Sequence, residues 1–135
     1  MTVDDEKAMK WINENTPEDA VFAVNLEPWI PNFPIGTDGG YWIPYYTGRK
    51  TTAGTMLSGF GTELDIGKGQ AEATLALYGE NPSVDNLCKL GVAYVYIAGK
   101  PASYAQSFTS DELIQLPNVV SLFRSGDAQV LGICQ

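Results

Sequence analysis

The feature that most restricts the fold is the run VAYVYIAG at residues 92–99. This run is rich in β-branched and aromatic residues, is apolar at positions that would face both sides of a sheet, and directly follows a predicted helix that ends at Gly91. A strand buried on both faces belongs in the interior of a sheet with helices packed against it. The sequence therefore predicts a central strand at residues 92–99.

Helix and strand patterns alternate along the rest of the chain. The predicted elements are a helix at 4–15, a strand at 20–25, a long loop at 26–40, helices at about 62–78, 83–91 and 110–116, and hairpin strands at 118–124 and 128–134. This alternation is typical of an α/β domain. We expect one domain over residues 1–135, layered around a central, partly parallel mixed sheet of about four to five strands, with flanking helices and the C-terminal β-hairpin at an edge.

The N-terminal part of the chain carries two of these assignments. The predicted helix at 4–15 opens with three acidic residues, which suit the positive end of a helix dipole. Its predicted buried face consists of Ala8, Trp11, Ile12 and Asn15. Residues 26–40 contain three of the eight prolines, so neither a strand nor a helix is expected to run through them for long, and we expect a long ordered loop. Loops of this length are often functional.

Charge and hydropathy exclude several classes of partner. Sixteen acidic and eight basic side chains give a net charge of −8, which repels the phosphate backbone of a nucleic acid, so we expect no nucleic-acid partner. The apolar runs are too short to span a bilayer, and the first ten residues lack the pattern of a signal peptide. We therefore expect the chain as given to be soluble.

The chain has no histidine and only two cysteines, Cys88 and Cys134. These are too few and too far apart for a zinc site, and the commonest metal ligand and general base is missing. We expect no metal site and no His-dependent catalysis. For the cysteines we favour two buried free thiols, and one disulfide is the alternative if the domain faces an oxidising compartment.

The stretch GGYWIPYYTGRKTT at residues 39–52 is the candidate binding site. Tryptophan and tyrosine side chains on a loop beside two basic residues can stack on a sugar ring, hydrogen-bond to its hydroxyls or hold a linked phosphate. The candidate ligand-binding residues are Trp42, Tyr45, Tyr46, Arg49 and Lys50.

The same stretch also has a structural interpretation. Tyr41, Ile43 and Tyr45 alternate with Trp42 and Tyr46 about a proline, as residues do on the two sides of an extended segment. On this interpretation, which we favour, at least half of the aromatic side chains are buried under the first helix. Elsewhere we find no complete catalytic motif, and thus no catalytic residue.

Four segments carry a resemblance to a known family. They are MKWINENTPEDAVFAVN at 9–25, GGYWIPYYTGRKTT at 39–52, LGVAYVYIAG at 90–99 and VVSLFRSGDAQVLGIC at 119–134. Together they resemble the soluble C-terminal region of polytopic bacterial and archaeal membrane proteins, which are similar to integral-membrane glycosyltransferases that use polyprenyl-phosphate sugars. In that family the helix in the first of these segments leaves the last membrane span.

The resemblance implies a non-catalytic accessory domain on the extracytoplasmic face of the cell membrane, as a soluble fragment of a larger membrane protein. In that family the catalytic carboxylate lies in an early loop between membrane helices, so the resemblance places no catalytic residue or cofactor in this chain. The implied partners are the membrane-embedded part of the same chain and a carbohydrate or lipid-linked sugar in contact with residues 26–55. Two alternatives stay open: a free-standing small α/β enzyme, and a purely structural or interaction module.

Overall fold

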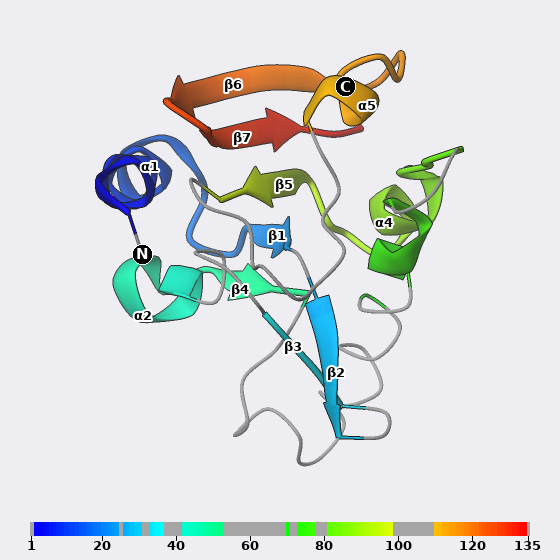
Figure 1. The fold of residues 1–135 in the computed structure, drawn as a ribbon, viewed down its shortest axis with the longest axis horizontal. Helices are drawn as coiled ribbons and strands as arrows, with labels where there is room; N and C mark the ends of the chain where they lie inside the picture. The colour runs from blue at the N-terminus through cyan, green and yellow to red at the C-terminus, as the bar shows by residue number, and fades with distance from the viewer. Residues whose placement is uncertain are drawn as a thin grey trace.

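The computed structural model describes residues 2–24, 26–30, 33–36, 42–52, 70, 73–77, 81–98 and 110–134. The elements within these residues are α1 Val3–Asn15, β1 Val21–Ala23, β2 Leu26–Ile30, β3 Phe33–Gly36, α2 Ile43–Thr47, β4 Lys50–Thr51, η3 Leu75–Leu77, α4 Asp85–Lys89, β5 Tyr94–Ile97, α5 Ser110–Leu113, β6 Val120–Ser125 and β7 Ala128–Gly132 (Figure 1). The predicted helix at 62–78 falls mostly outside the described residues.

Five of these strands form one mixed sheet in the order β4-β1-β5-β7-β6. Strand β1 is parallel to both β4 and β5, whereas β7 is antiparallel to β5 and β6. The α/β prediction is therefore confirmed, including the partly parallel sheet and the C-terminal hairpin at its edge. Strand β5, which was predicted from residues 92–99, lies in the middle of the sheet.

The sheet is buried on both faces. Successive residues of its inner strands point to opposite sides and enter two different buried clusters. Ile12 of α1, Phe22 of β1 and Tyr96 of β5 belong to one buried cluster. Leu87 of α4, Val95 of β5 and Leu131 of β7 belong to a second cluster. Figure 1 shows α1 and α4 on opposite sides of the strands, in keeping with this division into three layers.

Helix α1 begins at a capping box. The backbone amide of Asp5 donates to the hydroxyl of Thr2, and the Asp5 carboxylate accepts from the Thr2 amide at 2.9 Å. Asp5 is buried and also accepts a hydrogen bond from the hydroxyl of Tyr96. The helix therefore starts at a fixed point on the sheet, from the N-cap residue Thr2, whose backbone is extended.

The predicted face of α1 is partly wrong. The buried residues are Asp5, Ala8, Met9 and Ile12. Trp11 is only half-buried, stacking on Phe123 with ring centroids 5.5 Å apart, and Asn15 is exposed. The true face is rotated toward Met9, because Asp5 is drawn inward by its hydrogen bonds to Thr2 and Tyr96.

The predicted loop at 26–40 contains a short hairpin, so the prediction of a loop is corrected for the residues of β2 and β3. Strands β2 and β3 pair antiparallel as a separate two-stranded sheet. Pro28 stands opposite Pro34 in the register, and a bulge follows between Pro28 and Ile30. Among the described residues this sheet has two strands only, and proline is tolerated in strands that lie at a sheet edge.

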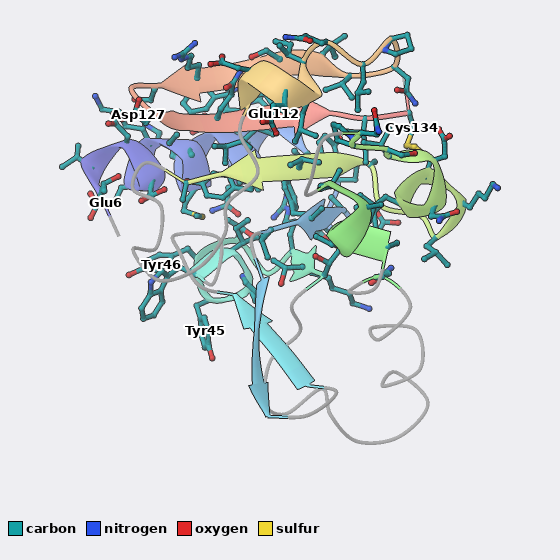
Figure 2. All side chains as sticks on the ribbon, turned by 45° about the vertical axis from the view of Figure 1, so that its right-hand side comes forward. Glu6, Tyr45, Tyr46, Glu112, Asp127 and Cys134 are labelled. Atoms are coloured by element: carbon teal, nitrogen blue, oxygen red, sulfur yellow. A yellow bond between two sulfur atoms is a disulfide. The ribbon has the colours of Figure 1, made fainter. Side chains whose placement is uncertain are left out.

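Among the described acidic residues, several lie on the surface. Glu6, Glu112 and Asp127 are exposed, and Figure 2 shows them on α1, on α5 and at the turn between β6 and β7. These three carboxylates lie on separate elements and are therefore not gathered at one site. No helix in the described part of the chain is long and apolar enough to cross a membrane.

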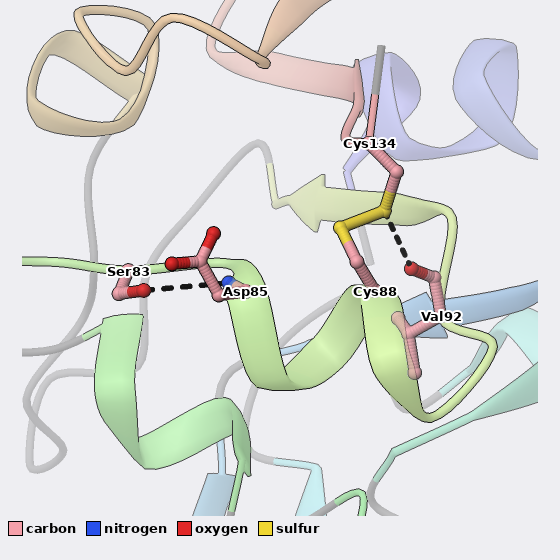
Figure 3. The surroundings of a disulfide bond; sticks show 5 residues. All are labelled: Ser83, Asp85, Cys88, Val92 and Cys134. Atoms are coloured by element: carbon pink, nitrogen blue, oxygen red, sulfur yellow. Dashed lines mark hydrogen bonds between the residues drawn. A yellow bond between two sulfur atoms is a disulfide. The ribbon is translucent and has the colours of Figure 1, made fainter.

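A disulfide joins Cys88 and Cys134, so the favoured expectation of two free thiols is wrong (Figure 3). It links α4 to the residue that closely follows β7, with the two Cα atoms 5.7 Å apart. The Sγ of Cys134 lies 3.5 Å from the carbonyl oxygen of Val92, and since a bridged sulfur carries no proton this is a packing contact. The bridge therefore ties α4 to the C-terminal end of the sheet.

Candidate functional site

The candidate site is built on α2, a single helical turn between the β2–β3 hairpin and β4. A helix brings residues i, i+3 and i+4 to one side, and here these are Trp42, Tyr45 and Tyr46. Ile43 and Thr47 point inward and are buried. The chain leaves α2 through Gly48 at φ 71°, a left-handed conformation that glycine adopts without strain.

The three aromatic side chains are 39%, 61% and 55% exposed, in sequence order. The expectation that at least half of the aromatic side chains in this stretch are buried is therefore wrong; Tyr41 lies outside the described residues. The expectation of burial was wrong because the aromatic residues were assigned to the two sides of an extended segment, whereas the backbone here is helical. A spacing of i, i+3 and i+4 around Trp42 was the available signal.

We call Trp42, Tyr45 and Tyr46 the aromatic face. The ring of Trp42 lies 5.8 Å from that of Tyr45 and 6.2 Å from that of Tyr46, centroid to centroid. Figure 2 shows the Tyr45 and Tyr46 side chains pointing away from the body of the domain. Neither the first nor the last turn of α2 carries a charge of its own. Such a surface can stack against the apolar face of a pyranose while the hydroxyls hydrogen-bond to it.

Arg49 lies behind this helix and is only 8% exposed. Its Nε donates to the hydroxyl of Thr16 and the carbonyl of Pro17, at 3.3 and 3.2 Å. Its Nη1 donates to the side-chain oxygen of Asn13 and the carbonyl of Thr47, at 3.1 and 2.7 Å. Its Nη2 donates to the carbonyls of Asn13 and Thr16, at 3.3 and 2.7 Å.

These contacts use every N–H of the guanidinium, which has five. Arg49 thus has no donor left for a ligand in this arrangement, although sequence reasoning grouped it with the ligand-binding residues. Lys50, by contrast, is exposed on the edge strand β4. The structure therefore brings Trp42, Tyr45 and Tyr46 together, leaves Lys50 on the surface, and turns Arg49 inward. That any of them binds a ligand stays a prediction.

Sequence reasoning missed Asn13. Its Nδ2 donates to the carbonyl of Tyr46 at 3.1 Å while its Oδ1 accepts from Arg49, so it joins α1 directly to the helix of the aromatic face. The available signal was an amide side chain in the last turn of a helix, where backbone carbonyls need partners. Among the described residues no group of three or more His, Cys, Asp or Glu is placed to hold a metal ion.

Within the described part of the chain, one buried hydroxyl has no hydrogen-bond partner in the structure. It belongs to Thr51 of β4, whose residue is 7% exposed. Its register partner Phe22 belongs to the cluster on the α1 side of the sheet. A lone hydroxyl of this kind is commonly satisfied by one ordered water, so it defines no ligand by itself.

Fold and site together define a three-layer α/β domain that is closed by one disulfide and presents an aromatic helical turn. No protein-family model and no curated protein matches this sequence. Among solved structures, the fold is similar to the C-terminal globular domain of oligosaccharyltransferase from Archaeoglobus fulgidus, with a TM-score of 0.54 and 17% sequence identity. The alignment covers 98% of each chain, so the two domains share an architecture over their whole length.

Proposed function

We propose that this chain is a non-catalytic, extracytoplasmic accessory domain of a glycosyltransferase-like membrane protein. The observation that carries the proposal is the fold likeness, which spans 98% of this chain and of a C-terminal globular domain of an oligosaccharyltransferase. A match over both full lengths fits an equivalent unit better than a shared substructure. On this proposal the chain's main partner is the membrane-embedded part of the same protein.

The disulfide supports the extracytoplasmic placement. Disulfides persist mainly in oxidising compartments, and reducing systems keep cytosolic thiols free in most organisms. Cys88 and Cys134 are separated by 46 positions in the sequence and still meet at bonding distance, which fits a structural bridge. The same placement follows from the sequence resemblance described above.

The aromatic face is the proposed contact with a glycan or a lipid-linked sugar. Trp42, Tyr45 and Tyr46 supply ring surface and two hydroxyls, and the exposed Lys50 can reach an anionic group such as a linked phosphate. Large aromatic side chains left exposed together on one short helix cost solvation free energy, so a binding role is the natural account of them. On this proposal Arg49 does not contact the sugar but supports the site by hydrogen-bonding to the end of α2.

Saturation-transfer NMR with chitotriose and maltotriose tests the glycan contact. We expect Trp42→Ala to weaken binding by roughly tenfold, because it removes the ring that touches both tyrosines. The melting temperature should hardly change, since exposed substitutions usually cost less than about 0.5 kcal/mol. Leu90→Ala is the matched control, because it removes an exposed apolar side chain at the C-cap of α4, a helix that Figure 1 shows away from α2.

Two results would overturn the glycan contact. One is the absence of binding to either sugar. The other is binding that Trp42→Ala leaves unchanged, which would place the sugar elsewhere on the domain. A large loss of stability in Trp42→Ala would instead assign the ring a packing role.

A further inference from the structure

We infer that Arg49 is a positioning residue that sets the orientation of the aromatic face by locking α2 to the end of α1. The inference rests on the proposed function for its ligand, but its geometry is independent of any ligand. Sequence reasoning had grouped Arg49 with the ligand-binding residues. The inference gives its buried guanidinium a positioning role instead.

The acceptors of Arg49 come from two segments of the chain, residues 13–17 around the end of α1 and Thr47 at the end of α2. Asn13 and Thr16 belong to the last turn and the C-cap of α1, and Pro17 opens the turn that leads to β1. Thr47 is the last residue of α2. One side chain therefore fixes the ends of two helices against each other and against the entry to the sheet.

Electrostatics explains why a cation is tolerated there. The carbonyl groups at the C-terminal end of a helix lack internal partners and carry the negative end of the helix dipole. Neither α1 nor α2 has a basic residue in its own last turn. All six hydrogen bonds of the guanidinium go to neutral oxygen atoms, so Arg49 serves as the shared C-terminal cap of both helices.

Asn13 reinforces the lock from the side of α1. It accepts from Arg49 and donates to the carbonyl of Tyr46, while Arg49 itself donates to the next carbonyl, that of Thr47. Two consecutive carbonyls of α2 are thus bonded, one directly by Asn13 of α1 and the next by Arg49, which is itself bonded to α1. The backbone of Tyr46 cannot turn without breaking these bonds. Since Tyr46 is part of the aromatic face, the bonds also fix the orientation of that face.

A lysine cannot replace this arrangement. Its ammonium carries three donors at one point, whereas the planar fork of arginine reaches acceptors that lie in different directions. Arg49→Lys therefore keeps the charge but loses some of the bonds that join the end of α1 to the end of α2. This makes it a sharper probe of positioning than removal of the whole side chain.

Hydrogen exchange tests the inference without a ligand. The reporter is the amide of Gly48, which donates to the carbonyl of Pro44 at the end of α2, and the internal reference is the amide of Ile133, which donates to Ala93 in the sheet. We expect Arg49→Lys to raise the exchange rate of Gly48 relative to Ile133 by roughly tenfold. The control Leu87→Ala opens the cluster that contains Ile133, so it should raise exchange at Ile133 and should not raise the rate of Gly48 relative to Ile133. An unchanged ratio in Arg49→Lys overturns the inference.

A second measurement connects the lock to binding. Chitotriose should bind Arg49→Lys more weakly by roughly fivefold, although every ring of the aromatic face is intact, and should bind folded Leu87→Ala as it binds the unchanged protein. Equal binding by Arg49→Lys and the unchanged protein counts against a positioning role. If the unchanged protein binds no sugar, the proposed function fails, and the exchange ratio alone decides the role of Arg49.

Discussion

Single residues in this domain are held by partners that lie far away in the sequence. Asp5 bonds Tyr96 across 91 positions, and Arg49 bonds Asn13 across 36. In the sequence both residues look like ordinary surface charges, one in an acidic helix start and the other in a basic turn. Their burial follows from tertiary contacts, which a residue's local neighbours do not encode.

Gly126, in the turn between β6 and β7, is expected to resist substitution. Its φ of 57° is left-handed, and a Cβ there would lie 2.3 Å from a carboxylate oxygen of Asp4. That carboxylate is itself bonded by the Ser125 hydroxyl at 2.8 Å. We expect Gly126→Ala to lower the free energy of unfolding by about 1 to 3 kcal/mol, measured by urea denaturation.

Gly91→Ala is the matched control for that measurement. Gly91 has a similarly positive φ of 82°, but a Cβ there meets nothing within 4 Å. It should therefore carry the backbone cost alone, and the excess in Gly126→Ala reports the displaced Asp4. Equal losses in the two variants would show that the Asp4 contact adds nothing.

At the level of elements, the disulfide is the link between α4 and the end of the sheet. Closing a loop of 46 positions is worth about 4 kcal/mol in the chain-entropy model. We expect the double variant Cys88→Ala, Cys134→Ala to have a free energy of unfolding, measured by urea denaturation, that is lower by up to this amount. A thiol titration of the unfolded, unreduced protein should find no free thiol; two thiols per chain would contradict the bridge.

Elements with a strong local pattern could be predicted from the sequence, and the others could not. Strand β5 and the β6–β7 hairpin follow from their apolar runs and their turns. The single turn of α2 was missed because five residues with a proline carry little helical pattern, and the bridge was missed because it depends on a spatial distance. The aromatic residues were recognised, but their common exposure follows only from the helix.

At the level of the whole molecule, the two buried clusters share one sheet. Strand β5 sends Tyr96 into one cluster and Val95 into the other, and β7 divides Val130 and Leu131 in the same way. Opening either cluster therefore exposes residues next to the other. This coupling is the physical reason why the layers should not unfold separately.

We expect a single cooperative transition, as is usual for domains under about 150 residues. Far-UV circular dichroism reports the helices and the sheet, and the fluorescence of the half-buried Trp11 reports the contact between α1 and β6. The fluorescence is best followed in the double variant Trp29→Phe, Trp42→Ala, which leaves Trp11 as the one tryptophan of the three in the sequence. The two curves should share one midpoint in urea. Separate midpoints would mean that α1, and with it the lock on the aromatic face, detaches before the sheet unfolds.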